Sequence, residues 1–362
     1  MTNKIVVGRW EVQALLINAI CARIFLGFAR SVAYDAGTAA WLETIFFSLL
    51  ALLVFIITEK LYRPFAGRDI LDVAEKAAGR FGSVFFGLVM LAVLLTIGSI
   101  ILRQYAEDIK VVALPNTPIG FVMVVLLAAA WIGAYLGLEA ILRYHALAVP
   151  AIILGLVIIL VGVFPLFKAA NLLPFFGNGI PVILLKGIAK TSTFAPMVYL
   201  LFLAPFLISH QQFQGSGYGG LMAAAVLLTL TAAVHMMVYG YPMVTENFLP
   251  IYQLARCINF GMFFQRIESV FLFSWVISAL LYLSVILYFA CYVVKRCFRL
   301  QYVRPLLVPV VIILFSLGFI PPNLMSVLRL DDLYGTFSGI FTLLLPLLII
   351  IVARLRGAAA KE

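Results

Sequence analysis

Charged residues are scarce in this chain of 362 residues, and cysteine and histidine are scarcer still. Asp, Glu, Lys and Arg make up 11% of the sequence, against about a quarter in soluble domains. The four cysteines form no C-x-x-C pair and the three histidines are scattered, so neither a disulfide framework nor a metal site is predicted. Nucleotide-binding and H-E-x-x-H signatures are absent, and no nucleophile, base and acid group together. We therefore expect no enzyme and no cofactor.

Apolar residues take the place of the missing charges. They account for 65% of the sequence, and the mean hydropathy is +1.15. A membrane-spanning helix needs about 20 apolar residues, which predicts an all-α polytopic membrane protein with ten spans in a single domain, 1–362, whose loops are too short to bury a separate core. The first apolar run lacks a cleavage site, so no cleaved signal peptide is expected. The predicted spans are 11–34, 41–59, 82–104, 118–138, 145–167, 186–210, 218–241, 266–294, 304–321 and 335–354.

The net charge of +10 could indicate a nucleic-acid partner. In a sequence of this hydropathy, however, basic residues mark the cytoplasmic face of a membrane protein. With a cytoplasmic N-terminus, fifteen basic residues fall on the cytoplasmic side and nine on the outer side. This excess favours an even number of spans with both termini in the cytoplasm, and membrane lipid rather than nucleic acid as the surroundings.

The sixth predicted span is interrupted in its middle. Thr191, Ser192 and Thr193 separate one apolar half from a second half that opens at Pro196. Proline fixes its own φ and disfavours a helical residue before it, which predicts a break in the helix. Irregular backbone at membrane depth is tolerated where protein buries it or water wets it, so a broken span indicates a ligand or ion site. The alternative is a surface loop followed by a proline-kinked helix.

Arg23 lies near the middle of the first predicted span. An arginine at that depth costs roughly 2.5–3.5 kcal/mol on insertion scales, which is tolerated when the side chain faces the bundle interior, a partner or water. Arg23 could bind an anionic ligand group such as a carboxylate. It could equally be structural, paired with Glu43 or extended toward Arg30.

Milder polar stripes follow helical spacing on three other spans, and each stripe occupies one helix face. They are Thr96, Ser99 and Arg103; Ser274, Ser278 and Tyr282; and Tyr334, Ser338 and Thr342. Small hydroxylated residues commonly join membrane helices, so packing is the expected role and cavity lining the alternative.

Two shorter patterns lie between spans. Residues 69–79 read as a short surface helix, with Asp69 as its N-cap, Gly79 as its C-cap and one apolar face; partner docking is the functional alternative. Glu139 and Arg143, four residues apart at the end of the fourth span, are expected to form a local ion pair.

Four segments of the sequence resemble one family. Asn171–Ile180, Leu114–Ile119, Gly37–Trp41 and Phe264–Val276 are similar to segments of the spore germination permeases, the B subunits of nutrient germinant receptors. The similarity covers nearly the whole chain, and the Arg266–Glu268 element within the last segment is fairly specific, whereas ten spans alone would not be. The family belongs to the amino acid, polyamine and organocation transporter superfamily.

The resemblance implies a five-plus-five inverted repeat, with repeats at about 11–167 and 172–354 and with spans one and six broken at a central ligand site. It also implies A and C partner subunits in the spore inner membrane, and a nutrient ligand that is commonly an amino acid. Residues 22–27 depart from the superfamily pattern, because one glycine and a charged residue stand where a glycine-rich break is expected. Arg23 could replace the missing backbone site.

These observations lead to a sensor whose pocket lies between spans one, three, six and eight. A ligand can act there only by binding one conformation better than another. The alternatives are a working secondary transporter coupled to protons or sodium, and a scaffold for the A and C subunits. The candidate binding residues are Arg23, Gly27, Thr191, Ser192, Thr193 and Phe194, followed by Ser274 and Ser278.

Overall fold

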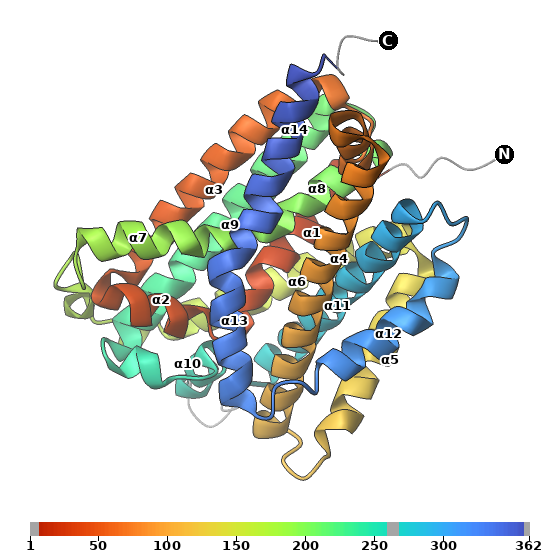
Figure 1. Ribbon diagram of the computed structural model, residues 1–362. Coiled ribbons are helices and arrows are strands. Elements are labelled where there is room, and N and C mark those ends of the chain that lie inside the picture. Colours follow the sequence, from red (N-terminus) through yellow and green to blue (C-terminus); the bar gives the residue numbers. More distant parts are fainter. Residues whose placement is uncertain (1–6, 259–267, 358–362) are drawn as a thin grey trace.

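The structure is a computed structural model that describes residues 7–258 and 268–357, and these residues contain helices and no strands (Figure 1). Arg266 and Ile267 of the family-like segment lie outside the described residues. Eight helices in the described ranges are long and apolar enough to cross a membrane: Phe28–Phe65, Ile70–Val112, Ile119–Leu136, Leu138–Leu166, Ile180–Phe206, His210–Tyr239, Phe271–Cys297 and Leu324–Leu355. The chain is therefore all-α and polytopic, while the count of ten spans stays a prediction.

The first predicted span is broken. Helix α1 (Arg9–Cys21) ends in a 3₁₀ turn, Ala22–Phe25, and the chain resumes as α2 (Phe28–Ala36). Nine of the thirteen residues of α1 are buried, so the break lies inside the protein. There the hydroxyl of Tyr105 donates a hydrogen bond of 3.3 Å to the Ala22 carbonyl, which binds one of the backbone groups freed at the end of the helix.

The sixth predicted span is also broken, at the predicted residues. Helix α7 (Ile180–Lys190) passes into a 3₁₀ segment, Thr191–Met197, and then into the short helix α8 (Val198–Leu203). The boundaries differ from those predicted, because α7 begins six residues earlier and the next helix already begins at residue 210. The polar residues before 218 did not prevent helix formation, since Ser209 caps that helix by accepting a hydrogen bond from the Gln212 amide at 3.2 Å.

The predicted short helix is the part of α4 (Ile70–Val112) that precedes a kink at Gly79, where two helices meet. Asp69 caps it as predicted, accepting a hydrogen bond of 2.8 Å from the Asp72 amide, and its apolar face is buried. Gly79, at φ +70° and ψ −173°, has a non-helical backbone and ends this first helix, as predicted. Asp69 also pairs with Arg296 at 2.9 Å, which joins the start of α4 to the end of α11 (Glu268–Cys297).

The remaining boundaries correct three predictions. Glu139 and Arg143 pair at 2.5 Å as expected, but they lie at the start of α6 (Leu138–Gly162) and not at the end of α5 (Ile119–Leu136). The ninth predicted span is short, with α12 covering Leu307–Leu317. The tenth begins eleven residues earlier than predicted: α13 (Leu324–Gly339) continues through a π turn, Ile340–Leu344, into α14 (Leu345–Leu355).

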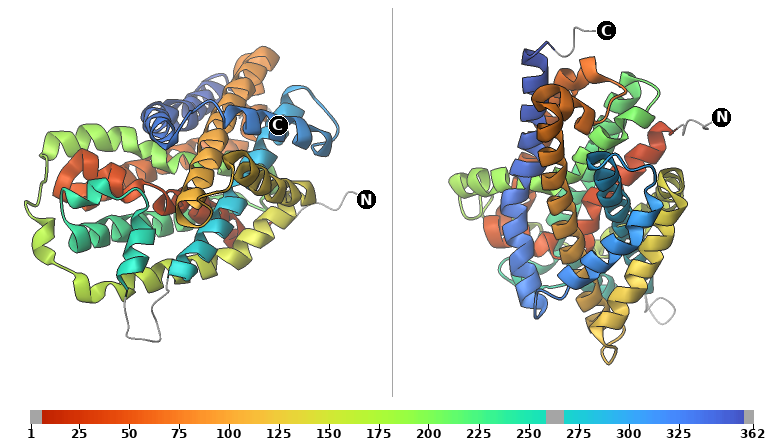
Figure 2. Two further views of the ribbon diagram at one scale, coloured as in Figure 1. Left: turned by 90° about the horizontal axis from the view of Figure 1, so that it is seen from below. Right: turned by 45° about the vertical axis from the view of Figure 1, so that its right-hand side comes forward.

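Helix packing places the broken segments together. Helix α1 packs on α9 (His210–Tyr239), where glycines allow close approach: a Cβ atom on Gly220 would lie 2.9 Å from the Leu16 Cβ. Helices α2 and α7 lie side by side across one flank of the bundle (Figures 1 and 2). Helix α7 packs in turn on α3 (Ala40–Tyr62), and α13 packs on the 3₁₀ segment 191–197.

Candidate ligand-binding site

A cavity of about 720 Å³ lies between the broken helices and α13. Its lining includes Tyr34 and Met325, whose side chains are 74% and 51% exposed, so the cavity reaches the protein surface. Eight charged residues line it, five basic and three acidic: Arg23, Arg30, Lys186, Lys190, Arg329, Asp35, Asp331 and Asp332. This excess of positive charge favours a ligand with an anionic group.

Arg23 pairs with Asp331 of α13 at the inner end of this cavity. The Nη1 to Oδ2 distance is 3.1 Å, and the two side chains are 21% and 20% exposed. The alternative pairing of Arg23 with Glu43 is wrong. Arg23 also lines a second, smaller hollow, so the ion pair stands at the boundary between the two spaces.

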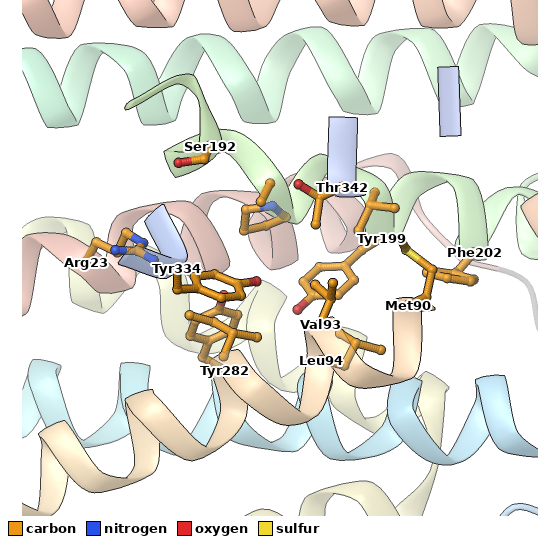
Figure 3. Close-up of a pocket in the computed structure, with 14 residues that line it drawn as sticks. Arg23, Met90, Val93, Leu94, Ser192, Tyr199, Phe202, Tyr282, Tyr334 and Thr342 are labelled. Atoms are coloured by element: carbon orange, nitrogen blue, oxygen red, sulfur yellow. The ribbon is translucent and has the colours of Figure 1, made fainter. Parts of the chain in front are cut away.

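The smaller hollow is aromatic and has a volume of about 20 Å³. Tyr199, Tyr282 and Tyr334 line it from α8, α11 and α13, and Figure 3 shows Tyr282 and Tyr334 beside Arg23. A space of this volume holds about one water molecule. A larger group could enter it only if these aromatic rings moved apart.

Two lysines of α7 converge on one carboxylate of α2 at the wall of the larger cavity. Lys190 Nζ lies 3.3 Å and Lys186 Nζ 3.7 Å from the oxygens of Asp35. Lys190 also donates a hydrogen bond to the Ser31 hydroxyl. These contacts hold α2 and α7 together just before the point at which the sixth span breaks.

The predicted residues of the sixth span fall into two groups. Ser192 and Thr193 line the larger cavity, and Ser192 donates a hydrogen bond to the Gly335 carbonyl. The Thr191 hydroxyl donates at 3.0 Å to the Gly187 carbonyl of its own helix. Phe194 is fully buried and lines neither hollow.

The remaining predicted residues lie apart from the boundary between the hollows. Gly27 lines the larger cavity, and a Cβ atom there would meet no atom within 4 Å. Ser278 is paired with Asn18: its hydroxyl donates at 2.8 Å to the Asn18 Oδ1, and the Asn18 amide donates at 3.2 Å to the Ser278 carbonyl. Ser274 is buried on the same helix, α11, and lines neither hollow.

The acidic residues of the site were missed by the sequence reasoning. Asp331 and Asp332 were placed before the tenth span, whereas the structure places them in a helix that is continuous with it. Two adjacent acids so close to a predicted span were the available signal. Lys186 and Lys190 were among the nine basic residues assigned to the outer side by their position in the predicted topology, and no contact with Asp35 was predicted.

Comparison with known proteins adds independent evidence to this geometry. A sequence model of the spore germination protein family matches residues 9–326. Spore germination proteins YndE and A2 of Bacillus subtilis are 22% and 23% identical to the chain, covering 99% and 95% of it and 99% and 94% of their own lengths. The crystal structure of MhsT in complex with L-phenylalanine matches with a TM-score of 0.73 at 15% identity, covering 98% of this chain and 93% of MhsT. The fold is thus that of a transporter, and the chain belongs to the spore germination permease family.

Proposed function

We propose that the protein is the nutrient-sensing, transporter-like subunit of a germinant receptor and that it binds a small nutrient, an amino acid, in the larger cavity. The carrying observation is the Arg23–Asp331 pair at the boundary between a charged cavity and an aromatic hollow. An amino acid carries both charges of this pair and an additional side chain. Its carboxylate can therefore replace Asp331 as the partner of Arg23, and its ammonium group can replace Arg23 as the partner of Asp331. Its side chain then contacts the aromatic rings.

The proposed mechanism is a competition at this boundary. The ligand carboxylate takes the place of Asp331 on Arg23, and the ligand ammonium group binds the carboxylates of Asp331 and Asp332. The ligand then stands between Arg23 and Asp331, and α13 can shift relative to the 3₁₀ turn after α1 because the two side chains no longer contact each other directly. A conformation in which the rings part is then favoured by the ligand's higher affinity for it.

The proposal includes the setting that the family resemblance implies. The subunit would act with A and C subunits in the spore inner membrane, with both termini in the cytoplasm, and pass its conformational change to those partners. The breaks at Ala22–Phe25 and Thr191–Met197 fall at comparable places in the two halves of the chain. This correspondence supports ten spans in a five-plus-five inverted repeat, 11–167 and 172–354.

The test is stabilisation of the purified protein by a panel of amino acids, sugars and nucleosides. A ligand at 100 times its dissociation constant raises the free energy of unfolding by about 2.7 kcal/mol. We expect an amino acid to stabilise the wild type and an Arg143→Gln control, whose guanidinium is in an exposed pair, but not Arg23→Gln. Equal stabilisation of all three proteins would refute the proposed role of Arg23.

The second candidate function is secondary transport of an amino acid coupled to protons or sodium. It is favoured by the match to MhsT over nearly the whole of both chains. Radiolabelled amino acid would accumulate in proteoliposomes that contain this chain alone if the protein is a transporter. A sensor would bind the same amino acid without accumulating it.

A further inference from the structure

Glu43, on α3, is a fully buried acid with no hydrogen-bond donor. Its exposed fraction is 0%, and neither of its carboxyl oxygens has a partner. Among the acidic residues in 7–258 and 268–357, it is the only one with both oxygens buried and unpartnered. The proposed ligand contacts do not use it.

Close contact with α7 seals this carboxyl group from solvent. A Cβ atom added at Gly187 would lie 2.5 Å from the ring of Phe46 and 3.7 Å from the Cγ of Glu43. The two helices can approach so closely only because residue 187 has no side chain. Glu43 therefore faces the last turns of α7, just before the break at Thr191.

The charges that act on Glu43 come from the wall of the larger cavity. They are Asp35 on α2 and Lys186 and Lys190 on α7. Helices α9 and α14 and the 3₁₀ segment 191–197 also pack against α3. In the part of the chain that the structure describes, these three elements place no further charged group close enough to act on Glu43. Both lysines are paired with Asp35 instead of Glu43.

An ionised carboxylate without a donor is strongly disfavoured in such surroundings, and the neutral acid is disfavoured much less. The arrangement in the structure is therefore that of a protonated Glu43. If the proton leaves to water, the resulting carboxylate requires a cation. Lys190 is the candidate for this cation. It lies on the helix that faces Glu43, its side chain is 22% exposed, and it already pairs with Asp35.

We propose that Glu43 is a proton-binding site linked to the larger cavity through Lys190. Protonated Glu43 leaves Lys190 with Asp35 and available to an anionic group in the cavity. Ionised Glu43 draws Lys190 toward α3 and weakens both contacts. Binding of an anionic group beside Lys190 thus takes up a proton, and its affinity falls as the pH rises, by at most tenfold per pH unit.

The site itself is tested without any ligand, by infrared spectroscopy of the full chain in lipid nanodiscs during a pH titration. We expect the wild type to show the carbonyl band of a protonated carboxyl group, which disappears as the pH rises. Glu43→Gln should lose the Glu43 component of this band, whereas a component from Asp108, whose Oδ2 is also buried without a partner, should stay. The control Glu139→Gln, at an exposed ion pair, should keep the Glu43 component. A titration that is identical in the wild type and Glu43→Gln would overturn the proposal.

Lys190→Met provides a second test, which remains valid even if Glu43→Gln does not fold. Removing the cation that compensates the carboxylate should move the loss of the band to higher pH. An unchanged titration in this variant would overturn the link through Lys190, even if the band belongs to Glu43.

The linkage to the cavity rests on the proposed function, and its failure can be distinguished from failure of the proton site. Each amino acid of the panel is added in turn to unbuffered protein, and proton uptake is followed with a pH indicator. Uptake by the wild type and none by Glu43→Gln supports the linkage. Binding without uptake in either protein refutes the linkage, whereas a titrating band with no binding by any amino acid refutes the proposed function alone.

Discussion

Removing one member of the Arg23–Asp331 pair should destabilise the protein by an amount that the structure bounds. At 3.1 Å and an effective dielectric constant of about 20, two unit charges attract by about 5 kcal/mol. Breaking a fully buried pair costs roughly 3–5 kcal/mol, because the remaining charge is left without compensation. About a fifth of each side chain is exposed here, so we expect a smaller cost than for a fully buried pair, about 2–3 kcal/mol for Asp331→Asn.

A double-mutant cycle isolates this interaction from other effects of the substitutions. We expect Arg23→Gln and Asp331→Asn together to cost about 2 kcal/mol less than the sum of the single variants, measured by reversible denaturant unfolding in mixed micelles. The same cycle at Glu139 and Arg143, which are 46% and 68% exposed, should give only about 0.3–0.5 kcal/mol. Additive effects at Arg23 and Asp331 would show that their contact does not contribute to stability. The proposed competition between the ligand and this ion pair would then have no basis.

Two other substitutions test the contacts around the broken helices. Gly187→Ala should push α7 away from Phe46 and lower the unfolding midpoint. The control Gly335→Ala should change the midpoint little, because a Cβ atom there meets nothing within 4 Å. Equal effects of the two substitutions would contradict the close packing of α7 on α3. Ser278→Ala leaves the buried Asn18 Oδ1 without its donor and should cost about 1–3 kcal/mol of unfolding free energy, and a cost near zero would show that the hydrogen bond is not needed.

The break in the sixth span was predictable because its cause is local. Pro196 and the three hydroxylated residues Thr191–Thr193 lie within one short segment of the sequence, and each acts on its own stretch of backbone. The break after α1 has no such local signal, since Gly27 is the only helix-disfavouring residue near it. It was expected from the family resemblance alone.

The charged partners in the site could not be predicted from a single sequence. Arg23 and Asp331 are 308 positions apart, and nothing in the residues themselves states which distant acid an arginine meets. The hydropathy of the sequence also placed the start of the tenth span too late. The apolar run that identified residues 335–354 excluded the polar first turns of the same helix. The sequence singled out Arg23 as a residue that requires compensation, and the tertiary structure identifies Asp331 as its partner.

The difference in volume between the two hollows bears on how the proposed sensor would discriminate nutrients. A cavity of about 720 Å³ has room for a small zwitterion, and on this proposal its charges would recognise the groups that all amino acids share. The side chain is sampled only by the hollow of about 20 Å³, which must expand to receive it. Discrimination among amino acids therefore cannot precede the parting of Tyr199, Tyr282 and Tyr334. On this mechanism, the step that identifies the nutrient is the same step that changes the conformation, as a signalling subunit requires.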